Sequence, residues 1–224
     1  EPEVLHGLEQ GADDYLAKPF RLDHLMEKIQ SMMALLESIE RRNPVTQLPG
    51  TDSIKREINH RLARGMAISA CYVDVCSFKG YCAVYNQQGQ RRVLEFMGAL
   101  LRQLTRDMGI YESFVSHLGG EHFVVLLNIE DYERFCNTLM VTFDRNIRQF
   151  YSEKELAQGY IVAVDKHGRE VRCPLMAISI GVAHTQYRQY KSAKKMFEVL
   201  AQTRQKAQPD GKSVMFIDRR RSDR

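Results

Sequence analysis

The chain lacks any apolar run that approaches the ~18 residues of a membrane span, and no signal peptide is visible at its start. Cysteine is scarce, and the five that occur are scattered and odd in number: Cys71, Cys76, Cys82, Cys136 and Cys173. Such a set does not form a zinc or disulfide framework, so we expect reduced thiols, mostly in the core. These absences favour a cytoplasmic protein and disfavour a membrane-embedded or disulfide-stapled one.

The excess of basic over acidic residues is also small. The formal net charge is +4 over 224 residues, of which 44% are hydrophobic, enough for one good core and a smaller second unit. Much of the positive excess lies in the tail 219–224, which indicates a solvated chain end. A nucleic-acid arm is the less favoured alternative, because aromatic side chains do not interleave with the basic ones. The chain begins at Glu1 rather than methionine, so we expect it to be a fragment of a longer protein.

Two short patterns occupy the first twenty residues. Residues 1–11 indicate a helix that ends at Gly11. Tyr15-Leu16-Ala17 predicts a short strand, and Lys18-Pro19 would stop it. Such a lysine at the rim of a sheet can pair with a carboxylate or a phosphate; an ordinary strand-to-helix turn is the alternative.

The segment Arg21 to Arg42 is an uninterrupted helical pattern. Its apolar residues step by four and three, which is typical of a dimerising helix seam. A helix that packs only on its own domain is the alternative. The seam consists of Leu25, Ile29, Met32, Leu36 and Ile39, and it is widened by Leu22, Met26, Met33 and Leu35.

Beyond a turn-rich linker at 43–50, strands and helices alternate. The pattern predicts an α/β or α+β fold with a mixed central sheet flanked by helices. The expected helices are 51–62, 78–108 (broken near 86–90), 129–150 and 193–207. The expected strands are 68–75, 111–116, 123–127, 160–164, 170–173, 175–183 and 213–217.

A Gly-Gly pair and an acid stand between two of the predicted strands. Gly119 and Gly120 allow a tight turn with positive φ, and Glu121 follows at the head of the next strand. Asp74 closes an earlier strand, so the two carboxylates converge if these strands are neighbours. Carboxylates suit Mg²⁺ or Mn²⁺. A hairpin that needs glycines only for its turn is the alternative.

Residues 11–20 resemble the end of a response-regulator receiver domain. There a Lys-Pro pair follows the last strand, and its lysine, here Lys18, contacts the phosphorylated aspartate. The resemblance implies a phosphoacceptor upstream of this chain and a partner histidine kinase. It divides the chain into a receiver end at 1–20, a last helix and stalk at 21–42, a main domain at 43–218 and a basic tail at 219–224.

The main domain resembles the GGDEF domains of diguanylate cyclases, whose fold is nucleotidyl-cyclase-like. The resemblance rests on four ordered matches: 45–49, 74–79, the signature Gly119-Gly120-Glu121-His122-Phe123, and 179–182. It implies a metal site at Asp74 and Glu121. Active members join two GTP molecules into cyclic di-GMP by metal-assisted phosphoryl transfer in a dimer.

The departures from the family pattern bear on activity. Cys82 and Arg91 stand where the resemblance places the two guanine-reading side chains, and Gln208 stands at a phosphate-binding lysine. His122 replaces the second acid of the signature, and His117 replaces the usual arginine before it. The product-inhibition motif should fall at 110–113, which reads Ile-Tyr-Glu-Ser. Losing both guanine readers and the lysine removes ~4 kcal/mol of GTP binding, on the order of a thousandfold.

Three functions remain open at this point. The favoured one is a two-component signalling output that has lost catalysis and acts on a protein partner, with the stalk as a homodimer seam. The second is an enzyme or receptor with a rebuilt nucleotide pocket, in which His122 could serve as ligand or base. The third, nucleic-acid binding through the tail and Arg91-Arg92, has the least support.

Overall fold

The structure is a computed structural model that describes residues 16–39, 42–164, 167–206 and 212–221. The chain divides into two compact units, Glu1–Arg41 and Arg42–Arg224. Among the described residues, no helix combines the length and the apolar character that a membrane crossing requires. The five cysteines all lie in the described part and are free thiols.

The first unit contains one described helix, α2 (Leu22–Ile39), as the sequence predicts. The predicted strand 15–17 is wrong for Leu16 and Ala17, which are not in a strand. Residues 16–39 contain no second strand to pair with them, and an isolated strand leaves its backbone groups without hydrogen bonds. Lys18 is exposed and joined to Pro19 by a cis peptide bond. The predicted helix 1–11 and Tyr15 lie outside the described residues.

One face of α2 is apolar and exposed to solvent in this chain. The exposed fractions are 72% for Leu22, 48% for Met26, 41% for Ile29 and 55% for Met33. Their spacing of four, three and four places them on one side of the helix. The side chains of Leu35, Leu36 and Ile39, which the sequence adds to this stripe, lie outside the described part.

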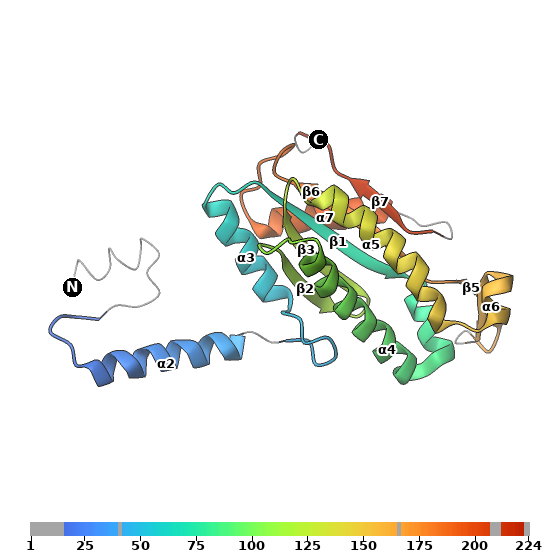
Figure 1. Ribbon diagram of the computed structural model, residues 1–224, viewed down its shortest axis with the longest axis horizontal. Coiled ribbons are helices and arrows are strands. Elements are labelled where there is room, and N and C mark those ends of the chain that lie inside the picture. Colours follow the sequence, from blue (N-terminus) through green and yellow to red (C-terminus); the bar gives the residue numbers. More distant parts are fainter. Residues whose placement is uncertain (1–15, 40–41, 165–166, 207–211, 222–224) are drawn as a thin grey trace. The chain divides into compact units, whose positions relative to one another are not determined.

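The second unit is built on a mixed five-stranded sheet in the order β2-β3-β1-β6-β7. All neighbouring pairs are antiparallel except β6 and β7. Figure 1 shows helices in front of and behind this sheet, as the predicted fold class requires. The five strands are β1 (Ile68–Cys76), β2 (Phe114–Gly119), β3 (His122–Asn128), β6 (Ala177–His184) and β7 (Val214–Ile217).

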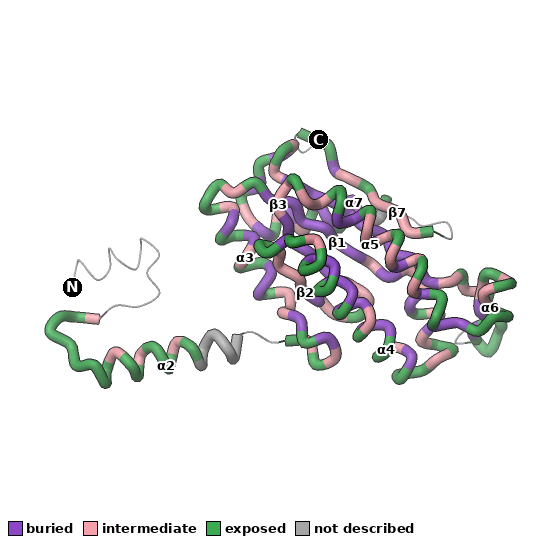
Figure 2. The backbone as a smooth tube through the Cα atoms, viewed as in Figure 1, coloured by how far each residue is buried: buried purple, intermediate pink, exposed green. Residues whose placement is uncertain are grey.

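Side-chain alternation along the strands divides the core into two layers. Odd-numbered residues of β1 and β3, such as Val73 and Val125, pack in the cluster that contains α4 and α5. Even-numbered ones, such as Ala70 and Val124, pack in the cluster that contains α3 and α7. Because side chains of a strand alternate between faces, residue parity decides which helices cover a given side chain. Figure 2 shows the buried strands between half-exposed helices. The helices are α3 (Thr51–Ala63), α4 (Phe78–Asp107), α5 (Tyr132–Asn146) and α7 (Ala193–Lys206).

The predicted break in the long helix is confirmed. Asn86, inside α4, has φ 56° and ψ −162°, outside the helical region. In the part of α4 that precedes the break, Tyr81 stacks on Tyr85 with ring centroids 4.4 Å apart, and the Tyr85 hydroxyl donates to Glu155 at 2.7 Å. The break therefore follows directly after a packed pair of aromatic rings.

Several predicted boundaries are shifted in the structure. The first predicted hairpin strand begins at Phe114 rather than Tyr111, because residues 111–112 form a turn. The predicted helix 129–150 is α5 followed by a 3₁₀ turn, η1 (Ile147–Phe150). Helix α6 (Glu153–Gln158) was not predicted, although Ser152 and Glu155 form a capping box at its start. The predicted second hairpin is confirmed: β4 (Tyr160–Val164) pairs with β5 (Glu170–Pro174), and the structure shows that the two form a sheet of their own.

Candidate functional site

Strand register brings the two predicted acids together. In the pairing of β1 with β3, Asp74 lies directly opposite His122. Both residues have even numbers, so both side chains point to the face covered by α3 and α7. Glu121 directly precedes His122 and lies in the turn that connects β2 and β3. The strands that carry the two acids are therefore neighbours, which is the condition under which the sequence predicted that the carboxylates converge.

The Gly-Gly turn holds Glu121 in place. Gly119 and Gly120 have φ values of 123° and 53°, which a side chain would strain. The carbonyl of Glu121 accepts a hydrogen bond from the Val75 amide at 3.2 Å. This bond ties the turn to the end of β1, one residue beyond Asp74.

His117 is hydrogen-bonded to the same turn. Its Nε2 lies 2.8 Å from the Gly120 carbonyl oxygen, and its Nδ1 lies 3.1 Å from the Thr46 hydroxyl. A carbonyl only accepts, so Nε2 carries the proton and Nδ1 accepts from Thr46. Burial lowers the pKa of His117, which keeps the ring neutral. The sequence marked His117 only as a replaced arginine; its structural role is to tether the turn.

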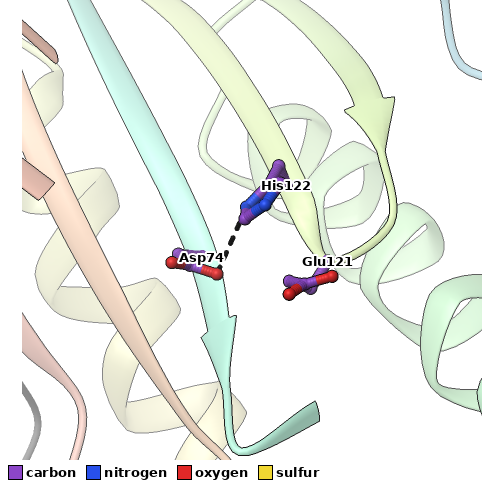
Figure 3. Close-up of side chains that lie close together, drawn as sticks. All are labelled: Asp74, Glu121 and His122. Carbon is purple, nitrogen blue, oxygen red and sulfur yellow. Dashed lines mark ion pairs between the residues drawn. The ribbon is translucent and has the colours of Figure 1, made fainter. Parts of the chain in front are cut away.

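Asp74, Glu121 and His122 converge on one point (Figure 3). One ligand atom from each lies within 4.8 Å of the other two. The His122 Nδ1 lies 3.3 Å from the Asp74 Oδ1. This contact, dashed in Figure 3, is an ion pair when the ring is protonated; the nitrogen is buried and makes no hydrogen bond to the described residues. His122 is thus turned toward the acids rather than lying on the surface beside the hairpin, the commoner arrangement for such a residue.

Two cations accompany the cluster. Arg204, from the last turn of α7, donates from Nη1 to the Asp74 Oδ2 at 2.9 Å, and its guanidinium lies over the Tyr72 ring at 5.5 Å. Lys79 Nζ lies 3.8 Å from the Glu121 carboxylate, but its side chain is 88% exposed. Burial raises the pKa of Tyr72, so its ring serves as a neutral platform. Arg204 is therefore the cation that is built into the site.

Gly181 allows this contact. It pairs with Tyr72 across β1 and β6, and a Cβ built on it would lie 3.0 Å from the Arg204 backbone nitrogen and 3.3 Å from its Cα. A side chain at this position would require α7 to move away from the sheet by a few tenths of an ångström.

Replacing Gly181 with valine is expected to lower the free energy of unfolding by about 1–3 kcal/mol, because the added methyl groups meet helix backbone rather than a mobile side chain. Chemical denaturation measures the loss. Gly181→Ala, which adds only the Cβ, should lose less. Equal stability of the three proteins would show that α7 is not held against β6 at this point.

Two of the three positions that the resemblance assigns to nucleotide recognition, Cys82 and Arg91, lie on α4. Cys82 is half-buried, and burial raises the pKa of its thiol, so it is a neutral group rather than an anionic one. Arg91 is exposed, and its Nε donates to Glu95 one helical turn later at 2.8 Å. Gln208 lies outside the described residues. Neither described side chain offers the acceptors that guanine's N–H groups need.

The site fits a divalent cation by the chemistry of its donors. Carboxylate oxygens and imidazole nitrogens are common metal ligands, and the site offers two carboxylates and one imidazole. The buried Nδ1 of His122 makes no hydrogen bond to the described residues. A metal bound there would polarise phosphate oxygens. The residues Asp74, Glu121 and His122 would hold it.

Arg204 and Tyr72 were not predicted as site residues. A signal for Tyr72 was present in the sequence, because Tyr72 and Asp74 are two residues apart in one strand and their side chains therefore point to the same face. Arg204 had no signal of its own. Its approach depends on how α7 crosses the sheet at Gly181, which no local pattern in the sequence specifies.

Neither a protein-family model nor the sequence of a curated protein matches the chain. Solved structures do match its fold. The GGDEF domain of TpbB (YfiN) from Pseudomonas aeruginosa covers 79% of this chain and 94% of its own, with a TM-score of 0.58 and 14% identity. The GGDEF domain of FimX from the same organism covers 79% and 98%, with a TM-score of 0.58 and 15% identity.

Longer neighbours extend the match. The P. aeruginosa diguanylate cyclase SiaD, solved with its activator SiaC, covers 96% of this chain and 74% of its own, with a TM-score of 0.57 and 18% identity. The coiled coil and GGDEF domain of DgcB from Caulobacter crescentus covers 93% and 99%, with a TM-score of 0.56 and 13% identity. At these identities the comparison establishes architecture, and the chain has the fold of GGDEF domains.

Proposed function

We propose that this chain is a signalling output module with a GGDEF fold that acts by protein contacts and does not convert GTP to cyclic di-GMP. The observation that carries the proposal is the ion pair between Arg204 and Asp74, 2.9 Å from Nη1 to Oδ2. It places a cation on Oδ2 of Asp74, leaves only Oδ1 toward His122 and offsets part of the negative charge of the site. A phosphoryl-transfer site uses its carboxylates to hold metal ions that also bind the substrate phosphates, and a site of reduced negative charge is less suited to that role.

The two base-recognition positions on α4 support the same conclusion. Cys82 and Arg91 replace the side chains that would pair with guanine, and Arg91 is turned along α4 toward Glu95. A site that reads a base by hydrogen bonds loses about 1–3 kcal/mol for each missing partner. A thousandfold loss of GTP affinity follows from two such losses and a lost phosphate lysine.

Calorimetric titration of GTP, ATP and cyclic di-GMP, each with Mg²⁺ or Mn²⁺, tests this proposal. We expect no binding tighter than about 100 μM and no cyclic di-GMP among the products of incubation with GTP. Micromolar, metal-dependent binding that Asp74→Ala or Glu121→Ala abolishes would contradict the proposal. That result would favour the second candidate, a nucleotide enzyme or receptor with a rebuilt pocket.

The contact surface that we assign to the module is the apolar stripe of α2, formed by Leu22, Met26, Ile29 and Met33. All four are more than two-fifths exposed, and single exposed apolar residues are common but a continuous helical stripe is not. The neighbour from DgcB contains a coiled coil, and SiaD is bound by a protein activator. By analogy, the stripe of α2 pairs two copies, and a further protein partner reads the state of the dimer.

Replacing Met26 and Met33 together with glutamate should convert the dimer to a monomer. Buried unpaired charges in a helix seam are costly, so we expect the dimer dissociation constant to rise by at least about a hundredfold. Sedimentation equilibrium measures it. The matched control is His24→Glu with Ser31→Glu, which places two glutamates seven residues apart on exposed positions away from the stripe. A parent protein that is monomeric, or equal weakening by both pairs, would rule out this seam.

The upstream context completes the proposal. The match of Lys18-Pro19 to a receiver terminus supports a response regulator in which phosphorylation by a histidine kinase changes the geometry of the α2 pair. The test is the longer protein with its receiver: phosphorylation should shift its monomer–dimer equilibrium, and Met26→Glu with Met33→Glu should remove the shift.

A further inference from the structure

We infer that Asp74, Glu121 and His122 form a binding site for a borderline transition-metal dication of the Zn²⁺ and Co²⁺ class, and that His122 excludes Mg²⁺ as its resident ion. This inference concerns the ion that the three side chains select. It stands whether or not the module binds a nucleotide or a partner protein.

The geometry of the nearest pair supports a small, four-coordinate ion. Two ligand atoms that each lie about 2.0–2.1 Å from one tetrahedral ion are about 3.3–3.4 Å apart. The His122 Nδ1 and the Asp74 Oδ1 are 3.3 Å apart; they form an ion pair when the ring is protonated, and their geometry is not that of a hydrogen bond. An ion between them would satisfy the buried nitrogen, which has no hydrogen-bond partner within the described part of the chain. The Glu121 carboxylate, within 4.8 Å, completes three protein ligands after a side-chain rotation.

Arg204 has a consistent place in such a site. It binds Oδ2 of Asp74, so Oδ1 remains the oxygen that faces His122. Metal-binding carboxylates are commonly oriented by a hydrogen bond to their second oxygen. Arg204 is therefore a positioning residue, and it offsets part of the negative charge of the two acids. A site of reduced negative charge is a poorer host for Mg²⁺, which binds through charge and oxygen ligands.

The donor set discriminates between ions. Mg²⁺ requires oxygen ligands in near-octahedral geometry and gives up its water reluctantly. Imidazole suits Zn²⁺, Co²⁺ and Ni²⁺, and affinity for mixed nitrogen and oxygen sites rises from Mn²⁺ toward Cu²⁺. A histidine in place of the signature's second acid thus exchanges a hard site for a borderline one.

Titration of the full chain, without an affinity tag, with Co²⁺ and visible absorption tests the inference. We expect one equivalent to bind and to give the intense visible bands of four-coordinate Co²⁺. Zn²⁺ should displace it stoichiometrically, whereas a thousandfold excess of Mg²⁺ should not. His122→Ala should weaken Co²⁺ binding by about a hundredfold, and Glu121→Gln provides a second variant at the same site.

The control is His60→Ala, which removes an exposed histidine of α3 and should leave the affinity unchanged. Circular dichroism melting confirms that each variant is folded. His122→Glu, which makes the donor set all oxygen, should weaken Co²⁺ and let Mg²⁺ compete. The inference fails if Co²⁺ does not bind, if Mg²⁺ displaces it at comparable concentration, or if His122→Ala binds as tightly as the parent. It also fails if sulfur-to-cobalt bands in the near ultraviolet disappear with Cys76→Ser, because a thiolate would then hold the ion.

Discussion

Replacement of Asp218 by alanine is expected to lower the free energy of unfolding by about 3–5 kcal/mol, because it removes a buried carboxylate that faces a buried arginine. The side chains of Arg188 and Asp218 are 6% and 4% exposed, and their charged atoms are 3.9 Å apart. Asp218 also accepts from Arg220 Nε at 2.6 Å, and its amide donates to the Val182 carbonyl at 2.9 Å. The residue that the sequence placed at the end of the main domain therefore anchors the chain beyond β7.

Urea unfolding measures this effect, and Glu95→Ala is the matched control. Glu95 pairs with Arg91 at 2.8 Å, but the two side chains are 45% and 68% exposed, so its loss should cost no more than about 0.5 kcal/mol. The double variant Arg188→Met with Asp218→Leu should be more stable than Asp218→Leu alone, because it leaves no buried cation behind. A loss below about 1 kcal/mol for Asp218→Ala would show that the pair is solvated.

Acidification is expected to produce the second large loss of stability. His117 and His184 are 2% and 1% exposed, and burial lowers the pKa of both below the ordinary 6.5. Below pH 6.5 the unfolded chain therefore binds protons that the folded chain does not. The stability that the two neutral histidines give to the folded state is present above pH 6.5 and is lost as the pH falls toward their pKa values in the folded chain. Each histidine contributes up to about 1.4 kcal/mol per pH unit, so the pair contributes up to about 2.7.

The surroundings of the two rings explain why both remain neutral. His117 donates to the Gly120 carbonyl, which favours its charged form, but burial is the larger effect and the nearby His122 adds to it. Around His184, burial is again the larger effect, Arg219 lowers the pKa further and Asp218 opposes it. The His184 ring lies between Tyr132 and Tyr187, with centroids 5.2 and 4.5 Å away.

Unfolding free energies measured from pH 8 to pH 5 test this dependence. His184→Phe keeps the aromatic packing and removes one titrating group, so its slope below pH 6.5 should fall by about one proton. His117→Gln should lower the slope in the same way, at some cost in stability. Glutamine is chosen because it can still donate a hydrogen bond toward the Gly120 carbonyl. If neither substitution changes the slope, other groups govern the acid response.

Local sequence signals located most elements of the main domain. Apolar runs predicted the strands at β1, β3 and β6, a glycine turn predicted the second hairpin, and the stretch 86–90 predicted the break in α4. Each depends on a run of apolar residues or on a backbone conformation that few residues adopt. The missed elements are short. α6 has only six residues, and its capping box was present but no apolar period accompanied it.

The sequence by itself placed Asp74 at a strand end and Glu121 after a Gly-Gly turn, and it predicted that the two carboxylates meet if their strands are neighbours. Strand parity and a Gly-Gly turn act over a few residues, so they can be read directly from the chain. Only the tertiary structure decided that His122 faces Asp74 and that Arg204 binds its second oxygen. Those contacts depend on the pairing register of β1 with β3 and on the close crossing of α7 at Gly181. Both arise from packing between segments as many as 130 residues apart, such as Asp74 and Arg204, and no local pattern specifies that packing.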